Sequence, residues 1–112
     1  MDYETVKSPE QETLKDINKN IFTELDCSKD YVMQALNHKS EDIAMADKEL
    51  AMSSEELGHA MIIKDKIEKR IEKFKQERNQ HAEMIELSWY YTKHRVMAYV
   101  DWIKSLHEKY KK

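Results

Sequence analysis

The 112-residue sequence contains a single glycine and a single proline. All-β proteins use these residues in their many turns, and nucleotide-binding α/β folds use glycine in the loop that holds phosphate. The composition therefore argues against both classes. The chain is instead rich in alanine, leucine, methionine, glutamate, glutamine and lysine, which favour helices, and its length suits one domain. We expect an all-α protein built from a few long helices.

The sequence also lacks a second cysteine, an excess of basic charge and a long apolar run. Cys27 has no partner for an internal disulfide, which favours a reducing compartment. With 19 basic and 22 acidic residues the net charge is −3, so a basic footprint for nucleic acid is missing. No stretch approaches the roughly 18 apolar residues of a membrane span, and the first residues carry no hydrophobic signal core. We therefore expect a cytoplasmic protein that binds neither nucleic acid nor membrane.

The apolar residues recur at helical spacing in three segments, which predicts helices over residues 9–37, 41–74 and 82–107. The first helix starts at Ser8 and Pro9, because serine is a favoured N-cap and proline a favoured first-turn residue. Residues 1–8 are expected to form a flexible arm, and residues 9–112 a single helical domain. The lysines at the end of the third helix are expected to fray.

Two short polar segments separate the expected helices. In the first, around residues 37–42, Ser40 is expected to cap the second helix. The second lies near residues 76–80, in a stretch without apolar side chains. One uninterrupted helix over residues 41–110 is the alternative, since neither glycine nor proline marks this turn. Because short connections make successive helices antiparallel, the sequence predicts an antiparallel three-helix unit.

Charged residues on the apolar faces of these helices are informative, because an unpaired buried charge costs several kcal/mol. Glu56 lies near the middle of an apolar stripe in the second helix, and His59 follows it by one turn. In the first helix, Glu24 is the acidic residue expected to face inward. The other mid-helix acids are expected to point away: Asp16, Asp26 and Asp30.

Glu24 and Glu56 are also expected at the same height in the helical hairpin. Both are 16 residues from residue 40, the expected turn, which places each about 24 Å along its helix. Carboxylate oxygens with one imidazole suit iron, manganese or zinc. The spacing therefore predicts a metal site at Glu24, Glu56 and His59, and ion pairing of the two acids with Lys or Arg is the alternative.

Other residues with ligand chemistry have simpler structural interpretations. Glu49 is expected in an interhelix salt bridge, with metal ligation or admission of the metal as the alternative. His94 and Asp101 are expected near the surface of the third helix, with ligation as the alternative. Tyr31 is expected to pack, with a hydrogen bond into the site as the alternative. No catalytic role is expected for Cys27, which has neither a base nor a helix N-terminus beside it.

The remaining histidines, methionines and aromatic residues are expected to have structural roles. The histidines at helix ends are expected to cap or face solvent: His38, His81 and His107. Three methionines at helical spacing are expected in the core: Met45, Met52 and Met61. Without a basic groove around them, the aromatic residues of the third helix are expected in helix packing or a subunit interface: Trp89, Tyr90, Tyr91, Tyr99 and Trp102.

The two acidic positions and the histidine resemble a known motif. Glu24 in Phe22-Thr23-Glu24-Leu25, followed by Glu-x-x-His in Ser54-Glu55-Glu56-Leu57-Gly58-His59-Ala60, resembles the ferritin-like superfamily, which includes rubrerythrins and encapsulated ferritins. The match covers residues 14–74, and similarity to small ferritin-like proteins of phage and prophage genomes extends into the third helix. The resemblance implies a carboxylate-bridged di-metal centre that binds ferrous iron and oxidises it with oxygen or peroxide. Glu24 and Glu56 would be its carboxylate ligands and His59 its nitrogen ligand.

This chain departs from the superfamily in one respect. A full ferritin-like bundle carries the ligand set twice, whereas the third helix here has no acid-x-x-His. Two copies facing each other across a two-fold axis would complete both the bundle and the di-metal site. A mononuclear or vestigial site is the alternative.

The resemblance thus implies a homodimeric or larger iron-binding protein with ferroxidase activity, and manganese or zinc are the other candidate metals. The alternative function is a helical structural or assembly protein, with virion or capsule proteins as partners and a virion location if the chain is phage-encoded. A coiled-coil adaptor that binds partner helices is a third hypothesis.

Overall fold

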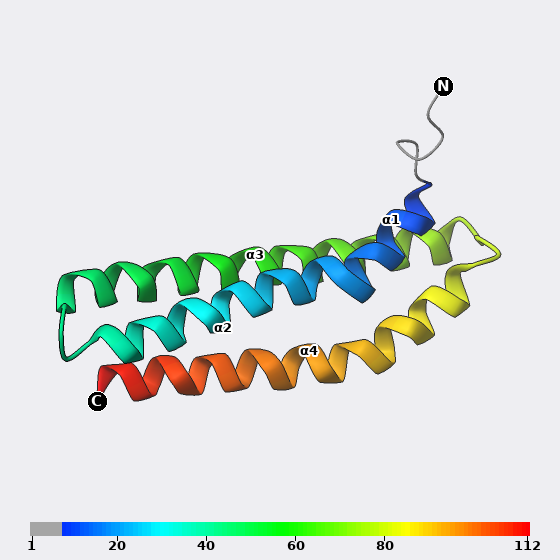
Figure 1. Ribbon diagram of the computed structural model, residues 1–112. Coiled ribbons are helices and arrows are strands. Elements are labelled where there is room, and N and C mark those ends of the chain that lie inside the picture. The colour runs from blue at the N-terminus through cyan, green and yellow to red at the C-terminus, as the bar shows by residue number, and fades with distance from the viewer. Residues whose placement is uncertain (1–7) are drawn as a thin grey trace, which may run out of the picture.

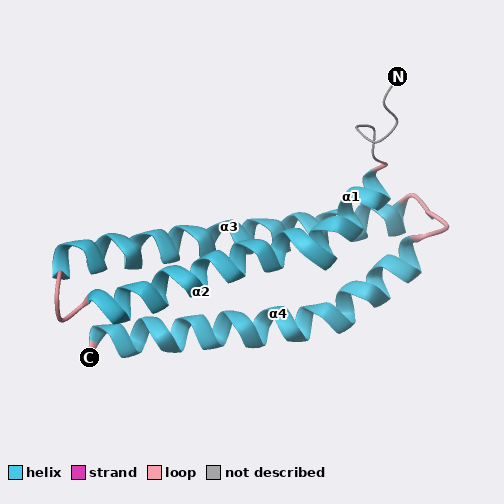
Figure 2. Ribbon diagram, viewed as in Figure 1, coloured by secondary structure: helices cyan, strands magenta, loops and turns pink. Residues whose placement is uncertain are grey.

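The computed structural model describes residues 8–112, whose helices form three rods joined by two short turns (Figure 1). The N-terminal rod is continuous and consists of α1 (Pro9–Lys15), the π-helical turn η2 (Asp16–Asn20) and α2 (Ile21–His38). The other two rods are α3 (Ile43–Gln76) and α4 (Ala82–Lys111). Figure 2 shows helix and loop but no strand in the described part of the chain. The all-α class and the three-helix arrangement are therefore confirmed.

Successive rods are antiparallel, so that α4 runs in the same direction as α2 (Figure 1). No helix between residues 8 and 112 combines the length and the apolar content that a bilayer crossing requires.

The arm predicted for residues 1–8 lies outside the described residues, apart from Ser8. Ser8 is the N-cap of α1, as predicted: its hydroxyl accepts the N–H of Gln11, whose side chain accepts the N–H of Ser8.

The prediction that Ser40 caps the second helix is wrong. The N-cap of α3 is Asp42, whose carboxylate accepts a hydrogen bond of 3.1 Å from the backbone N–H of Met45. The physical reason is that α2 continues through His38, so that Ser40 lies within the turn and the next helix begins later. Aspartate also has an extra benefit at this position, because its charge interacts favourably with the helix dipole.

The turn between α3 and α4 forms without glycine. Arg78 has a left-handed backbone conformation, with φ of 54°, and its N–H bonds to the carbonyl of Lys75. The N–H of Asn79 bonds to the carbonyl of Phe74 at 2.9 Å. These two bonds form a Schellman motif, which satisfies the last carbonyls of α3. The predicted turn near residues 76–80 is confirmed, and the uninterrupted helix is wrong.

The core has two apolar clusters separated by a polar layer. The larger cluster joins all three rods on the side of the polar layer that faces the α3–α4 turn, and it includes Ile17, Ile21, Leu25, Ile67, Ile85, Val96 and Ile103. The smaller cluster lies towards the other end and contains Ala35, Ala46 and Tyr110. Tyr110 is 5% exposed, and its hydroxyl donates to Asp47 while Lys39 contacts its ring and carbonyl oxygen. α4 remains helical as far as Lys111, so the expectation that its end frays is wrong.

The polar layer consists of Ser28, Ser53 and His107, one from each rod. The Ser28 hydroxyl donates to the Ser53 carbonyl at 2.7 Å, and the Ser53 hydroxyl lies 2.6 Å from the Ser28 carbonyl and 2.8 Å from His107 Nε2. Burial lowers the pKa of His107, which favours the neutral ring. His107 thus links α4 to α3, and the expectation that it caps a helix or faces solvent is wrong.

Candidate metal centre

Glu24, Glu56 and His59 lie together between the N-terminal rod and α3. Glu24 is in the first turn of α2, directly after η2, and Glu56 and His59 are one turn apart in the middle of α3. His59 Nδ1 is 3.6 Å from Oε2 of Glu24 and 3.6 Å from Oε2 of Glu56. One ligand atom from each residue lies within 4.8 Å of the other two. The antiparallel hairpin therefore brings together the three residues singled out in the sequence.

The cluster lies at the edge of the interface rather than in its apolar interior. The side chains of Glu24, Glu56 and His59 are 29%, 25% and 46% exposed. The sequence predicted an apolar stripe on α3 that included Met45 and Met52 together with Ala60 and Ile67, but the two methionines are 48% and 40% exposed. Ala60 and Ile67 are buried as predicted, but Ser53 is buried with them, so the buried face is displaced and Glu56 lies at its margin.

That shift of the buried face also corrects the expected roles of two methionines. Met45 and Met52 are surface residues and not core residues, whereas Met61 packs against the larger apolar cluster as predicted. An edge position gives an ion in solution access to the carboxylates, which a fully buried layer would not.

The two carboxyl groups are close enough to influence each other's ionisation. A hydrogen bond with Glu56 raises the pKa of Glu24, and partial burial and the charge of Glu56 act in the same direction, while His59 opposes them. Glu56 therefore stabilises the protonated form of Glu24 relative to an isolated glutamate. A bound metal ion would relieve the same repulsion between the two carboxylates, and it would release any proton held there, because metal ligands must be deprotonated.

The three residues fit a transition-metal ion. Carboxylate oxygen and imidazole nitrogen are ligands of iron, manganese and zinc. Bonds of about 2.1 Å in a tetrahedral site place ligand atoms roughly 3.4 Å apart, close to the 3.6 Å that separates the imidazole from each carboxylate. Among residues 8–112, no Lys or Arg forms an ion pair with either carboxylate, so the predicted alternative of such pairing is not realised there.

Glu49 forms the interhelix salt bridge that the sequence predicts. This carboxylate is 8% exposed, and its Oε1 lies 2.8 Å from Nδ1 of His38. The hydrogen bond with Glu49, followed by the charge of Glu49, raises the pKa of His38. His38 thus joins α2 to α3, a role that the sequence did not predict, while its side chain remains 40% exposed to solvent, in line with the expectation.

The other residues considered as ligands do not join the cluster. His94 and Asp101 are exposed on α4, and the His94 ring packs edge-on against Tyr90 at 5.2 Å. Within the described residues, Tyr31 makes no hydrogen bond to the cluster. Partial burial and the charges of Glu56 and Glu24 raise the pKa of the Cys27 thiol, which keeps it protonated and a poor nucleophile.

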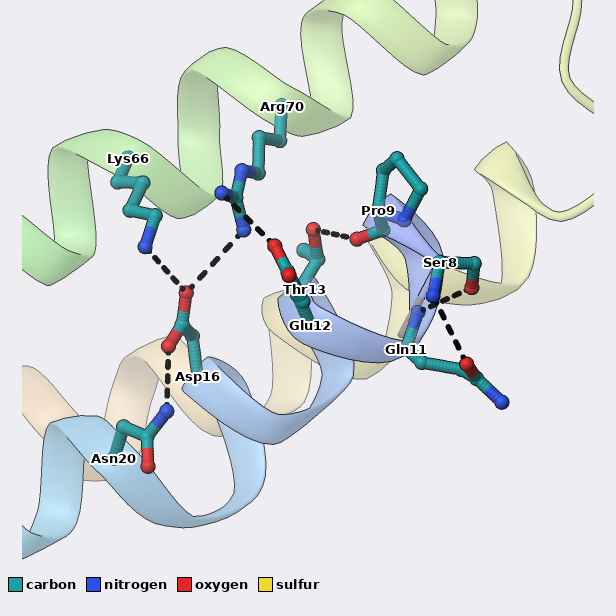
Figure 3. A network of polar contacts seen from close by, with 9 residues as sticks. All are labelled: Ser8, Pro9, Gln11, Glu12, Thr13, Asp16, Asn20, Lys66 and Arg70. Carbon is teal, nitrogen blue, oxygen red and sulfur yellow. Dashed lines mark hydrogen bonds and ion pairs between the residues drawn. The ribbon is translucent and has the colours of Figure 1, made fainter. Parts of the chain in front are cut away.

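A second polar cluster, around Asp16, was not anticipated from the sequence (Figure 3). Asp16 Oδ2 lies 3.5 Å from Lys66 Nζ and 3.5 Å from Arg70 Nη1, and Asn20 donates to Asp16 Oδ1 at 2.7 Å. Arg70 also pairs with Glu12 at 3.4 Å. The cluster joins the start of the N-terminal rod to the second half of α3.

The prediction that Asp16 points away from the core is wrong, because η2 is a π-helical turn. Its extra residue rotates α1 by about 100° relative to the register of α2. Thr13 and Asp16 consequently face the interior and are 0% and 5% exposed. Asp26 and Asp30 do point away, as predicted, and Asp26 accepts a hydrogen bond from Tyr99 of α4.

Glu68 of α3 is a further charged centre that periodicity did not reveal. Its carboxylate accepts hydrogen bonds from Lys93, Lys64 and Trp89 at 2.6, 3.0 and 3.1 Å. Partial burial raises the pKa of Glu68, but these hydrogen bonds and the charge of Lys64 outweigh it and lower the pKa to about 2. Trp89 is 5% exposed, so its predicted role in helix packing is confirmed.

Comparison with known proteins adds no family assignment. No family model matches the chain, and neither a curated protein nor a solved structure matches it. The ferritin-like interpretation therefore remains a prediction that rests on the spacing of Glu24, Glu56 and His59.

Proposed function

We propose that this protein binds a transition-metal ion, iron in the first instance, through Glu24, Glu56 and His59. The observation that supports this proposal most strongly is the convergence of three ligand atoms within 4.8 Å, two of them from carboxylates. Negative charge exceeds positive charge at this point, and the hydrogen bond with Glu56, followed by partial burial and the charge of Glu56, raises the pKa of Glu24. A divalent cation would neutralise the charge of both carboxylates, which the neighbouring side chains leave unbalanced.

A di-iron site would need ligands from a second copy of the chain, because three protein ligands are too few for two ions. A two-fold axis beside the cluster would supply the same three residues again. The partly exposed position of the cluster is compatible with such an approach. Met45 and Met52 lie at helical spacing on the same side of α3, and both are exposed, which gives a second copy apolar surface to cover.

The proposed activity is oxidation of ferrous iron by oxygen or peroxide. Bound iron supplies the electron that the oxidant takes up. Glu24 and Glu56 hold and charge-balance the ion, and His59 fixes its position through a single nitrogen ligand. Ion binding would release any proton that Glu24 holds beside Glu56, because metal ligands must be deprotonated.

Titration of ferrous iron into the anaerobic apo-protein tests this proposal. Iron bound per chain is measured first, and the ferric absorbance is followed after exposure to oxygen. The Glu56→Ala variant is expected to lose at least tenfold in iron affinity together with the oxidation signal. Glu55→Ala removes the exposed neighbouring carboxylate and serves as the matched control, which should behave like the wild type. Identical traces for the wild type and Glu56→Ala would refute the proposal.

A second candidate function is a helical structural or assembly role, in a virion if the chain is phage-encoded. One observation favours it: His59 Nδ1 is already 3.6 Å from both carboxylates, so a protonated imidazole can bridge them without a metal. Elemental analysis of the purified protein discriminates between the two functions. An intact assembly without stoichiometric transition metal would support the structural role.

A further inference from the structure

The outward face of α4 carries exposed apolar side chains over most of its length. We call this surface the outer α4 stripe; its residues recur at helical spacing and are Met84, Leu87, Tyr91, Ala98 and Trp102. The four large ones are 50%, 54%, 65% and 48% exposed. The other face of α4 packs into the core through residues such as Ile85, Val96 and Ile103. α4 is therefore apolar on two faces, and residues 8–112 cover one of them.

We propose that the outer α4 stripe binds the same stripe of a second copy of this chain, with the two α4 helices antiparallel about a two-fold axis. The charges of α4 favour this direction. Glu83 and Glu86 lie in its first two turns, whereas Lys109, Lys111 and Lys112 end the chain. An antiparallel pair sets the acidic end of one helix beside the basic end of the other, and it also opposes the two helix dipoles. A parallel pair would bring like charges together.

The spacing of the aromatic residues indicates the register. A two-fold axis near residues 96 and 97 places Tyr91 opposite the partner's Trp102, and symmetry repeats this contact. The small side chain of Ala98 lies next to the axis, where two helices must approach most closely. The same register brings Glu83 near the partner's Lys109. Neither Glu83 nor Lys109 forms an ion pair within residues 8–112.

A surface hollow near the start of α4 fits the opposing end of a second copy. It has a volume of about 460 Å³ and is lined by Glu83, Glu86, Leu87 and Tyr90. Leu87 and Tyr90 suit the aliphatic part of a lysine side chain, and the Glu83 carboxylate suits its ammonium group, whereas Glu86 already pairs with Lys75 at 3.0 Å. In the antiparallel register, the partner's Lys109 lies opposite this hollow.

The stripe also supplies much of the apolar area that a stable interface needs. A specific interface buries roughly 1,200 Å² or more in total, and aromatic side chains contribute on the order of 150–250 Å² each when fully covered. Because Tyr91, Trp102, Met84 and Leu87 are only about half exposed, these side chains from two copies supply a large part of this area but not all of it. The interface does not depend on metal binding, because Glu24, Glu56 and His59 lie between α2 and α3.

Sedimentation velocity of the full chain tests the proposal. Wild-type protein is expected to be a dimer or a larger even-numbered assembly. Tyr91→Glu and Trp102→Glu should each halve its mass or raise the dissociation constant at least tenfold, with unchanged helix content by circular dichroism. Ile62→Glu is the matched control, because Ile62 is 65% exposed on α3, outside the stripe. A monomeric wild type, or equal dissociation by Ile62→Glu, would overturn the proposal.

A charge exchange tests the antiparallel direction. Glu83→Lys and Lys109→Glu are each expected to weaken the assembly several-fold, because each places like charges opposite one another. The double variant should restore wild-type assembly, since the two charges are exchanged across the interface. Failure of the double variant to restore assembly would refute this register. Iron binding per chain, measured on the same variants, should stay unchanged, which separates this interface from the proposed metal site.

Discussion

Two polar clusters join the N-terminal rod to α3, and they differ in charge balance. Around Asp16, the carboxylates of Asp16 and Glu12 face two permanent cations, Lys66 and Arg70. Eight residues further along the rod, the carboxylates of Glu24 and Glu56 have the imidazole of His59 as their only ion-pair partner within residues 8–112. The first cluster is neutral with the charges of the chain alone. The second has an excess of negative charge, which makes it the candidate for binding a cation.

The two clusters also differ in access to solvent. The Asp16 side chain is 7% exposed, whereas those of Glu24 and Glu56 are 29% and 25% exposed. A buried and balanced cluster is expected to stabilise the packing of two helices. An accessible and unbalanced cluster can exchange a proton for an ion without unfolding. The combination of charge excess and access, rather than the number of acids, therefore distinguishes the candidate site.

The largest predicted effect comes from Asp16→Ala. The substitution removes the buried carboxylate beside Arg70 and leaves Glu12 as its ion-pair partner; within residues 8–112, Arg70 Nη1 already lacks a hydrogen bond. Loss of one member of a buried ion pair lowers the free energy of unfolding by about 3 kcal/mol, which urea denaturation would detect. Asp30→Ala removes an aspartate that is 61% exposed and should cost less than about 0.5 kcal/mol. Equal effects of the two substitutions would contradict the structural role of the Asp16 cluster.

The next largest effect is predicted for Glu68→Gln. The pKa of Glu68 is lowered from its ordinary value of 4.5 to about 2, so its ionised form stabilises the fold above pH 4.5 and this stabilisation is lost as the pH falls towards 2. After allowance for solvent screening, Glu68→Gln should lower the free energy of unfolding by about 1–2 kcal/mol at pH 7. The difference from the wild type should shrink below pH 4. A difference that is constant from pH 7 to pH 3 would be inconsistent with this origin.

Much of the fold and the candidate cluster could be predicted from the sequence, because both depend on periodicity. The spacing of apolar residues located the three helices, and equal distances from the turn brought Glu24 and Glu56 together across the hairpin. The depth of the cluster was not predictable in this way. Met45 and Met52 are exposed, but the apolar pattern alone does not distinguish them from core residues. Counting them as core moved the predicted centre of the buried face of α3 towards Glu56, which is in fact at its margin.

The Asp16 cluster could not be found because nothing in the sequence marks the π-helical turn. One extra residue in η2 changes which side chains face inward, and a helical wheel with a constant angle then misplaces Thr13 and Asp16. The Schellman turn at Arg78 was located only by an absence of apolar residues, since its left-handed residue is not glycine. Local departures from regular geometry were thus the main source of error.

Gly58→Ala is predicted to increase stability without changing the cluster. Gly58 lies between Glu56 and His59, and a Cβ placed on it would meet no atom within 4 Å. Alanine should raise the free energy of unfolding by about 0.5–1 kcal/mol, because glycine in a helix interior has a higher entropic cost. Iron affinity should remain at the wild-type value, since the helix itself sets the positions of Glu56 and His59. A loss of iron affinity would show that Gly58 is needed by the site.

The smallest predicted effect, Glu24→Gln, has the opposite pH dependence to Glu68→Gln. The pKa of Glu24 is raised by its hydrogen bond with Glu56, so the folded state favours the protonated form, and that stabilisation is lost as the pH rises through the pKa. Glutamine keeps a neutral hydrogen-bond donor beside Glu56 at every pH. The variant should therefore be more stable than the apo wild type by about 0.5 kcal/mol at pH 7 and equal to it at pH 3.

Urea denaturation of the apo-proteins at both pH values measures this difference, and added iron should reverse its sign at pH 7. The wild type would gain the free energy of metal binding, whereas the variant would lack one carboxylate ligand. A variant that is less stable than the apo wild type at pH 7 would mean that the ionised carboxylates are already compensated. The charge excess that separates this cluster from the Asp16 cluster would then not exist, and the case for a cation site would fail with it.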